Sequence, residues 1–187
     1  MVTLGSLVLP ILVSAALVWV ASALVWMVLP HHKSEWLRLP DEEAFRSALK
    51  GRQLAPGRYN VPFATGGAEL KNPEMVRKYE EGPVGILTLF PSGMPKMGGM
   101  MVGSFVYYLV VGFVVAYLAS RTLATGADYL TVFRVTGTTA WLAYGFAVVP
   151  ESIWFGRPWR STVLTLADAL LYALLTAGVF GWMWPGT

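Results

Sequence analysis

The chain alternates between long runs without charge and one polar segment. Residues 1–30 and 97–120 contain no charged side chain. Two further apolar runs carry Arg134 and Asp168 as the charges in their interiors. Each run is long enough to cross a bilayer at 1.5 Å per residue, which predicts four transmembrane helices over residues 4–29, 100–120, 129–149 and 160–184.

Particular residues predict where these apolar helices end. Pro150 predicts the end of the third helix. Trp182, Trp184 and Pro185 are typical of an interfacial anchor after the fourth. The tripeptide 21–23 (Ala-Ser-Ala) is also typical of a signal-peptide cleavage site. No basic residue precedes the first run, however, and the run continues to Leu29, so we expect an uncleaved helix.

The polar segment, residues 31–99, has the pattern of a small folded insert. Asp41 precedes a helical pattern that ends at Gly51, and Asn72 with Pro73 predicts a second helix ending at Gly82. Residues 58–63 and 84–90 are strand-like. The expected fold class is therefore membrane all-α: helix 1 in 1–30, a soluble α-β-α-β insert of the α+β type in 31–99, and helices 2–4 in 100–187.

Composition agrees with this division. Hydrophobic residues make up 55% of the chain and charged residues 13%, and 18 of the 25 charged side chains lie between residues 31 and 102. This excludes a freely soluble globule and a disordered chain. The chain has no cysteine, so disulfides and thiolate metal sites are excluded. Because acids are interleaved with the basic residues, no nucleic-acid partner is expected.

The orientation follows from the basic residues near the helix ends. The loop between helices 2 and 3 offers Arg121, whereas Arg157 and Arg160 precede helix 4, and Lys33 and Lys96 flank the insert. The positive-inside rule then favours a cytoplasmic insert, with both termini outside.

Two stretches of the insert carry a resemblance. They are LPDEEAFRSALKGRQLAPGRYNVPF and GPVGILTLFPSGMPKMG, and DYLTVFRVTGT in the third helix extends it. With these motifs the chain resembles a family of small bacterial inner-membrane proteins with four helices and no assigned function. The resemblance covers most of the chain and implies this architecture and location, but no reaction, substrate or site.

Small residues recur every fourth position in three of the expected helices. In the fourth they are Thr165, Ala169, Ala173, Ala177 and Gly181. Such spacing lets helix backbones approach closely. Packing within one bundle is the favoured interpretation, while a homodimer or contact with other membrane subunits remains open.

His31, His32 and Glu35 directly follow the first helix. If the helix continues, His31 and Glu35 share a face, and His32 can approach Glu35 three residues later. Two imidazoles with a carboxylate suit a transition metal. The favoured alternative is a polar helix end resting in the headgroup region.

Half of the eight methionines lie within eight residues, at Met94, Met97, Met100 and Met101. Clustered thioethers select Cu(I), and a histidine at the membrane face could complete such a site. Packing where a loop enters the bundle is favoured, so no cofactor is expected and copper is the alternative.

Arg134 and Asp168 are the ionisable groups deepest in the predicted bilayer. In an antiparallel pair of helices their depths differ by roughly 9 Å, which their side chains could largely span. Tyr172 shares a face with Asp168, and Thr138 shares one with Arg134. A structural ion pair is favoured over an ion or proton path.

These patterns predict a non-enzymatic inner-membrane protein that acts as a subunit or accessory of a membrane assembly. The alternatives are a small transporter or ion-handling protein that uses Arg134 and Asp168, and a membrane copper or metal protein that uses His31, His32, Glu35 and the methionine cluster.

Overall fold

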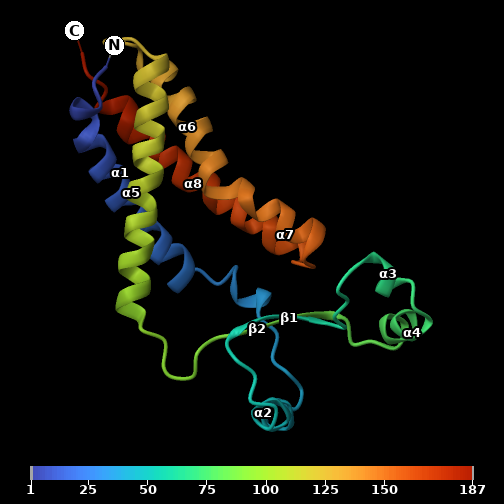
Figure 1. Ribbon diagram of the computed structural model, residues 1–187. Coiled ribbons are helices and arrows are strands. Elements are labelled where there is room, and N and C mark those ends of the chain that lie inside the picture. The colour runs from blue at the N-terminus through green and yellow to red at the C-terminus, as the bar shows by residue number, and fades with distance from the viewer. Residues whose placement is uncertain (1, 187) are drawn as a thin grey trace. The chain divides into compact units, whose positions relative to one another are not determined.

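The computed structural model describes residues 2–186 and is mostly helical, at 68%. Its described part contains four helices long and apolar enough to cross a membrane, over Leu4–Met27, Met97–Thr122, Tyr129–Trp154 and Trp159–Trp182 (Figure 1). The four expected apolar helices are therefore confirmed. The described residues form two compact units: a helical unit, up to Trp36 and from Lys96 onward, and an insert unit, Leu37–Pro95.

Eight elements make up the helical unit. They are η1 Leu4–Leu7, α1 Val8–Met27, η2 Lys33–Glu35, α5 Met97–Thr122, α6 Tyr129–Gly145, η3 Phe146–Val148, α7 Val149–Trp154 and α8 Trp159–Trp182. The expected helix end at Pro150 is wrong. Pro150 lies in the first turn of α7, where a missing N–H removes no intrahelical hydrogen bond, so the helical path continues to Trp154.

Close backbone approach holds α6 against α8. A Cβ added at Gly145 would lie 2.8 Å from the Ala169 Cβ, and one at Gly137 would lie 3.1 Å from the Ala177 Cβ. Gly145 has no room for a Cβ, and a Cβ at Gly137 would require Ala177 to move by a few tenths of an ångström. The prediction that small residues pack helices within one bundle is thus confirmed for this pair. The two contacts also show that α6 and α8 are antiparallel, with Gly145 level with Ala169.

The interior of the helical unit is apolar, and so is much of its outer surface. Val18, Val115, Val132 and Phe180 are completely buried between the helices. Large apolar side chains also cover the outer faces, for example Leu9, Val20, Val110, Phe113 and Leu171. Helices that are apolar on all sides are typical of an environment that is itself apolar.

The insert unit contains α2 Glu42–Lys50, β1 Gly57–Val61, α3 Gly67–Leu70, α4 Pro73–Glu81 and β2 Gly85–Leu89. Its strands pair antiparallel, with Tyr59 opposite Leu87. Asp41 and Asn72 cap α2 and α4: their side chains accept hydrogen bonds from backbone N–H groups, each at 2.9 Å. The predicted cap at Asn72 is thus confirmed. Among the described residues of this unit only Met75 is buried, so the insert has a thin core of its own.

Candidate metal centre

The segment after α1 turns sharply instead of continuing as a helix. Pro30 follows the last turn of α1, and the Lys33 and Glu35 backbone N–H groups bond to the Pro30 and His32 carbonyl oxygens, at 3.0 and 3.1 Å. This 3-10 turn is also tied to the start of α8, because the Arg160 guanidinium donates a hydrogen bond to Ser34 Oγ. The predicted contact between His31 and Glu35 on a continued helix is therefore not formed.

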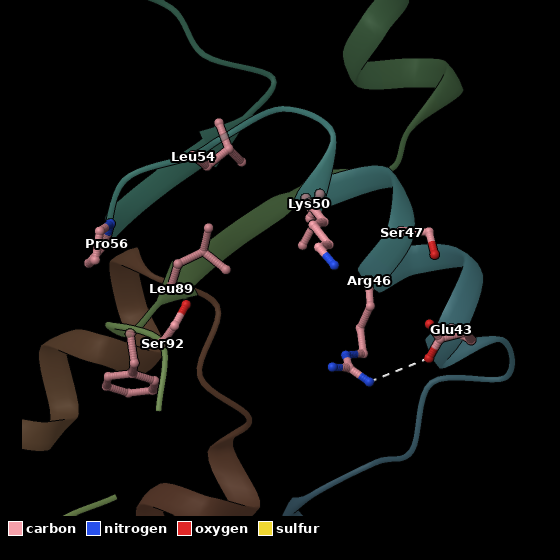
Figure 2. Close-up of a pocket in the computed structure, with 10 residues that line it drawn as sticks. Glu43, Arg46, Ser47, Lys50, Leu54, Pro56, Leu89 and Ser92 are labelled. Atoms are coloured by element: carbon pink, nitrogen blue, oxygen red, sulfur yellow. Dashed lines mark hydrogen bonds and ion pairs between the residues drawn. The ribbon is translucent and has the colours of Figure 1, made fainter. Parts of the chain in front are cut away.

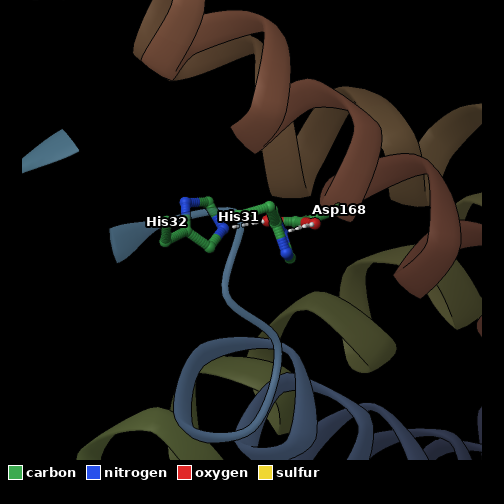
Figure 3. A group of neighbouring side chains, drawn as sticks. All are labelled: His31, His32 and Asp168. Atoms are coloured by element: carbon green, nitrogen blue, oxygen red, sulfur yellow. Dashed lines mark hydrogen bonds and ion pairs between the residues drawn. The ribbon is translucent and has the colours of Figure 1, made fainter. Parts of the chain in front are cut away.

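Both histidines instead contact Asp168, from the middle of α8 (Figure 3). His31 Nε2 lies 3.2 Å from Asp168 Oδ1, and His32 Nε2 lies 2.6 Å from Asp168 Oδ2. The other nitrogen of His32, Nδ1, lies 2.5 Å from Glu35 Oε1. Two carboxylates therefore hold one imidazole between them, and the Asp168 carboxylate connects the two histidines.

Burial differs across this group, which we call the His–Asp cluster (His31, His32, Glu35 and Asp168). The His32 side chain is 5% exposed, whereas that of His31 is 28% exposed and gives the cluster its opening to the surface. The Trp26 indole covers His32 by stacking parallel to it, with ring centroids 3.9 Å apart. A histidine fixed on one face and at both nitrogens has a single available orientation.

The same contacts set the protonation of His32. Burial lowers the pKa of its imidazole, but the hydrogen bonds and charges of Glu35 and Asp168 together outweigh burial, so the pKa lies above its usual value of 6.5. When His32 is protonated, both of its nitrogens can donate, one to each carboxylate.

The donor atoms suit a metal ion equally well. One ligand atom each from His31, His32 and Asp168 can be chosen so that all lie within 4.8 Å of one another. Two imidazoles and one carboxylate form a ligand set that catalytic zinc and non-haem iron sites share. Glu35 occupies the place of the outer carboxylate that commonly orients a metal-bound histidine through its second nitrogen.

Arg134 is not part of this cluster, so the predicted ion pair with Asp168 is not formed. Arg134 is an exposed side chain on α6, and the described ion pairs of Asp168 are with the two histidines. The reason is the helix register. Gly145 lies beside Ala169, and Arg134 is eleven residues away from Gly145, or about 16 Å along the helix.

Two other residues of the predicted polar group also lie apart from each other. Thr138 is exposed and, with Arg134, lines a shallow cavity of about 220 Å³ on the surface of α6 and α8. Tyr172, one turn after Asp168, is buried inside the bundle. Tyr172 thus shares a face of α8 with Asp168 of the His–Asp cluster, whereas Thr138 lies at the surface.

The four clustered methionines are not gathered into a buried site. Met94 belongs to the insert unit and is 91% exposed, and Met97 and Met100 on α5 are also exposed. Met101 is half-buried, and its carbonyl oxygen accepts a hydrogen bond from the Trp19 indole at 3.0 Å, which links α5 to α1.

The insert unit has a cavity of its own, of about 590 Å³ (Figure 2). Leu49, Leu54 and Leu89 form its apolar lining, and Arg46 and Lys50 line it from α2. Arg46 already pairs with Glu43 at 3.4 Å, and both side chains are largely exposed. This lining has no histidine and no buried charged group, so it does not compete with the His–Asp cluster as a metal centre.

Comparison with known proteins adds no further constraint: no family model, no curated protein and no solved structure matches this chain.

Proposed function

We propose that the protein is a multi-pass membrane protein that binds one divalent first-row transition metal ion through His31, His32 and Asp168. The observation that carries this proposal is the convergence of two imidazoles and a carboxylate within 4.8 Å, from segments 136 residues apart. Imidazole and carboxylate side chains are scarce in the helical unit, which contains few charged residues.

The hydrogen-bond geometry of the cluster supports a metal at the same point. A metal ion would replace the protons that now lie between the histidine nitrogens and the Asp168 carboxylate. Glu35 would keep its hydrogen bond to His32 Nδ1 and so hold the ring in its binding orientation. No large rearrangement is required.

The donor set also indicates which metals are favoured. Imidazole nitrogen and carboxylate oxygen suit Zn²⁺, Cu²⁺ and Fe²⁺, whereas Cu(I) selects thioether sulfur. We therefore replace the copper–methionine hypothesis with a nitrogen–oxygen site for a divalent ion, in which Met94, Met97, Met100 and Met101 take no part.

The apolar outer faces of four long helices support a location within a membrane. The bacterial inner membrane, with the insert cytoplasmic and both termini outside, is part of the proposal and rests on the resemblance and on the basic residues at the helix ends. A role as an accessory subunit or a homodimer stays a prediction.

The test is a metal titration of the metal-free protein in detergent, purified through a tag without histidine. We expect one equivalent of Zn²⁺ or Cu²⁺ by calorimetry, with loss of binding in His31→Ala and in Asp168→Asn. Asp128→Asn is the matched control, because Asp128 caps α6 and contacts Thr131 rather than a histidine. Wild-type protein that binds neither ion would leave the cluster as a structural ion pair and refute the proposal.

A further inference from the structure

The Tyr172 hydroxyl is a buried polar group without a hydrogen-bond partner. Tyr172 is 7% exposed, and its hydroxyl oxygen makes no hydrogen bond to the described part of the protein. Buried hydroxyl groups are nearly always paired, because an unpaired one loses its hydrogen bonds to water without replacement. An exception at this position calls for a partner that is not part of the chain.

Tyr172 lies one helical turn after Asp168, a member of the His–Asp cluster. Tyr172 and Asp168 share one face of α8, one turn apart. Side chains on a helix lean toward its N-terminus, so the Tyr172 ring leans over the turn that carries Asp168. Its hydroxyl comes near the indole of Trp26, the residue that stacks on His32, but forms no hydrogen bond of normal geometry with it.

The other surroundings of Tyr172 offer no alternative explanation. Its ring packs with Val18 and Val25 of α1 and lies edge-on to the Tyr108 and Tyr144 rings, with centroids 6.3 and 6.1 Å away. The Tyr144 hydroxyl, in contrast, has Thr176 Oγ1 at 3.2 Å. Of these clustered tyrosines, Tyr172 is the one that combines an unpaired buried hydroxyl with a place beside the cluster.

We propose that Tyr172 donates a hydrogen bond to a small anion or water held at an open position of the metal. This inference rests on the proposed metal site. Three protein ligands leave a fourth position free in tetrahedral coordination, and such a position normally holds water or a substrate. The ligand class is a small oxygen or nitrogen donor, because Tyr172 belongs to a cluster of buried aromatic and aliphatic side chains, and the partly exposed His31 is the most accessible member of the His–Asp cluster.

The experiment uses the full chain in detergent, loaded with Cu²⁺ and titrated with azide. Azide bound to Cu²⁺ gives a charge-transfer absorption band, so azide affinity and copper content are measured separately. Tyr172→Phe should weaken azide binding about tenfold, the contribution of one hydrogen bond to a charged group, while copper affinity changes less than about twofold. Tyr108→Phe is the matched control: a buried tyrosine that packs on Tyr172 and should leave both affinities unchanged.

The outcomes separate the two proposals. If copper does not bind to the wild type, the proposed metal site fails. If copper binds but azide affinity is the same in Tyr172→Phe and wild type, or azide does not bind at all, the role of Tyr172 is refuted and the metal site stands. A second measurement needs no variant: the infrared stretch of bound azide should shift in D₂O if an exchangeable hydroxyl proton contacts it, and an unchanged stretch would also overturn the inference.

Discussion

Removal of the Asp168 carboxylate should destabilise the helical unit strongly, even without metal. This carboxylate accepts from both histidines, at 3.2 and 2.6 Å, and its side chain is 12% exposed. Asp168→Asn would leave a protonated His32 with Glu35 as its remaining carboxylate. Loss of one partner from a buried charged pair costs about 3–5 kcal/mol. Because His31 is partly exposed to solvent, we expect about 2–4 kcal/mol.

A double-mutant cycle assigns this cost to the correct partner. Asp168→Asn is combined with His32→Gln in one cycle and with Arg134→Gln in a second. Residues in direct contact couple by about 0.5–3 kcal/mol, whereas sites more than about 10 Å apart are additive within about 0.5 kcal/mol. The structure therefore predicts coupling near the upper end of this range for His32 and additivity for Arg134.

The assay is equilibrium unfolding of the metal-free protein in mixed micelles, followed by circular dichroism, at a pH where His32 is protonated. The free energy of unfolding is compared for wild type, the three single variants and the two double variants. Coupling of Asp168 to Arg134 as large as its coupling to His32 would show that the α6–α8 register described above is wrong.

Three further predictions concern the same unit. Because the pKa of His32 is raised in the folded protein, its contribution to stability is complete below the unfolded pKa of about 6.5 and is lost as pH rises through the folded pKa. The unfolding midpoint of the metal-free protein should therefore fall as pH rises above about 6.5, and an equal fall in His32→Gln would contradict this. Gly145→Ala should lower the free energy of unfolding by about 1–3 kcal/mol, because its Cβ would meet the Ala169 Cβ at 2.8 Å. Gly103→Ala is the control: a Cβ there has no neighbour within 4 Å, so the free energy of unfolding should change by less than about 0.5 kcal/mol, and equal costs in the two variants would refute the close approach. Tyr144→Phe should cost about 1 kcal/mol through loss of the Thr176 hydrogen bond, and an unchanged free energy of unfolding would show that this bond contributes nothing.

The long helices were predictable because absence of charge is a local property. Both uncharged runs of more than twenty residues form helices, and Asn72 caps the helix that it was predicted to cap. Pro150 was misread because a proline can end one helix or occupy the first turn of the next, and the residues around it do not distinguish the two.

The partners of Asp168 were harder to predict, because they depend on the register between helices. Counting from the helix ends placed Arg134 and Asp168 roughly 9 Å apart in depth, within reach of their side chains, but the contact between Gly145 and Ala169 puts them about 16 Å apart along the helices. One feature of the sequence pointed to the histidines as partners of Asp168. In a four-helix chain the first helix ends on the side where the fourth begins, so His31 and His32 were among the ionisable groups on the same side as the start of the helix that carries Asp168. The unpaired Tyr172 hydroxyl had no such signal, since its pairing depends on side-chain packing.

Metal analysis of the protein from its native membrane tests the central claim most directly. The protein is extracted without chelator, purified through a tag without histidine, and measured by elemental analysis and X-ray absorption beside the His31→Ala, His32→Ala double variant. We predict about one equivalent of a divalent first-row metal, bound by two imidazoles and at least one oxygen ligand, and loss of that metal in the variant. Wild-type protein with no more bound metal than the double variant would contradict the account.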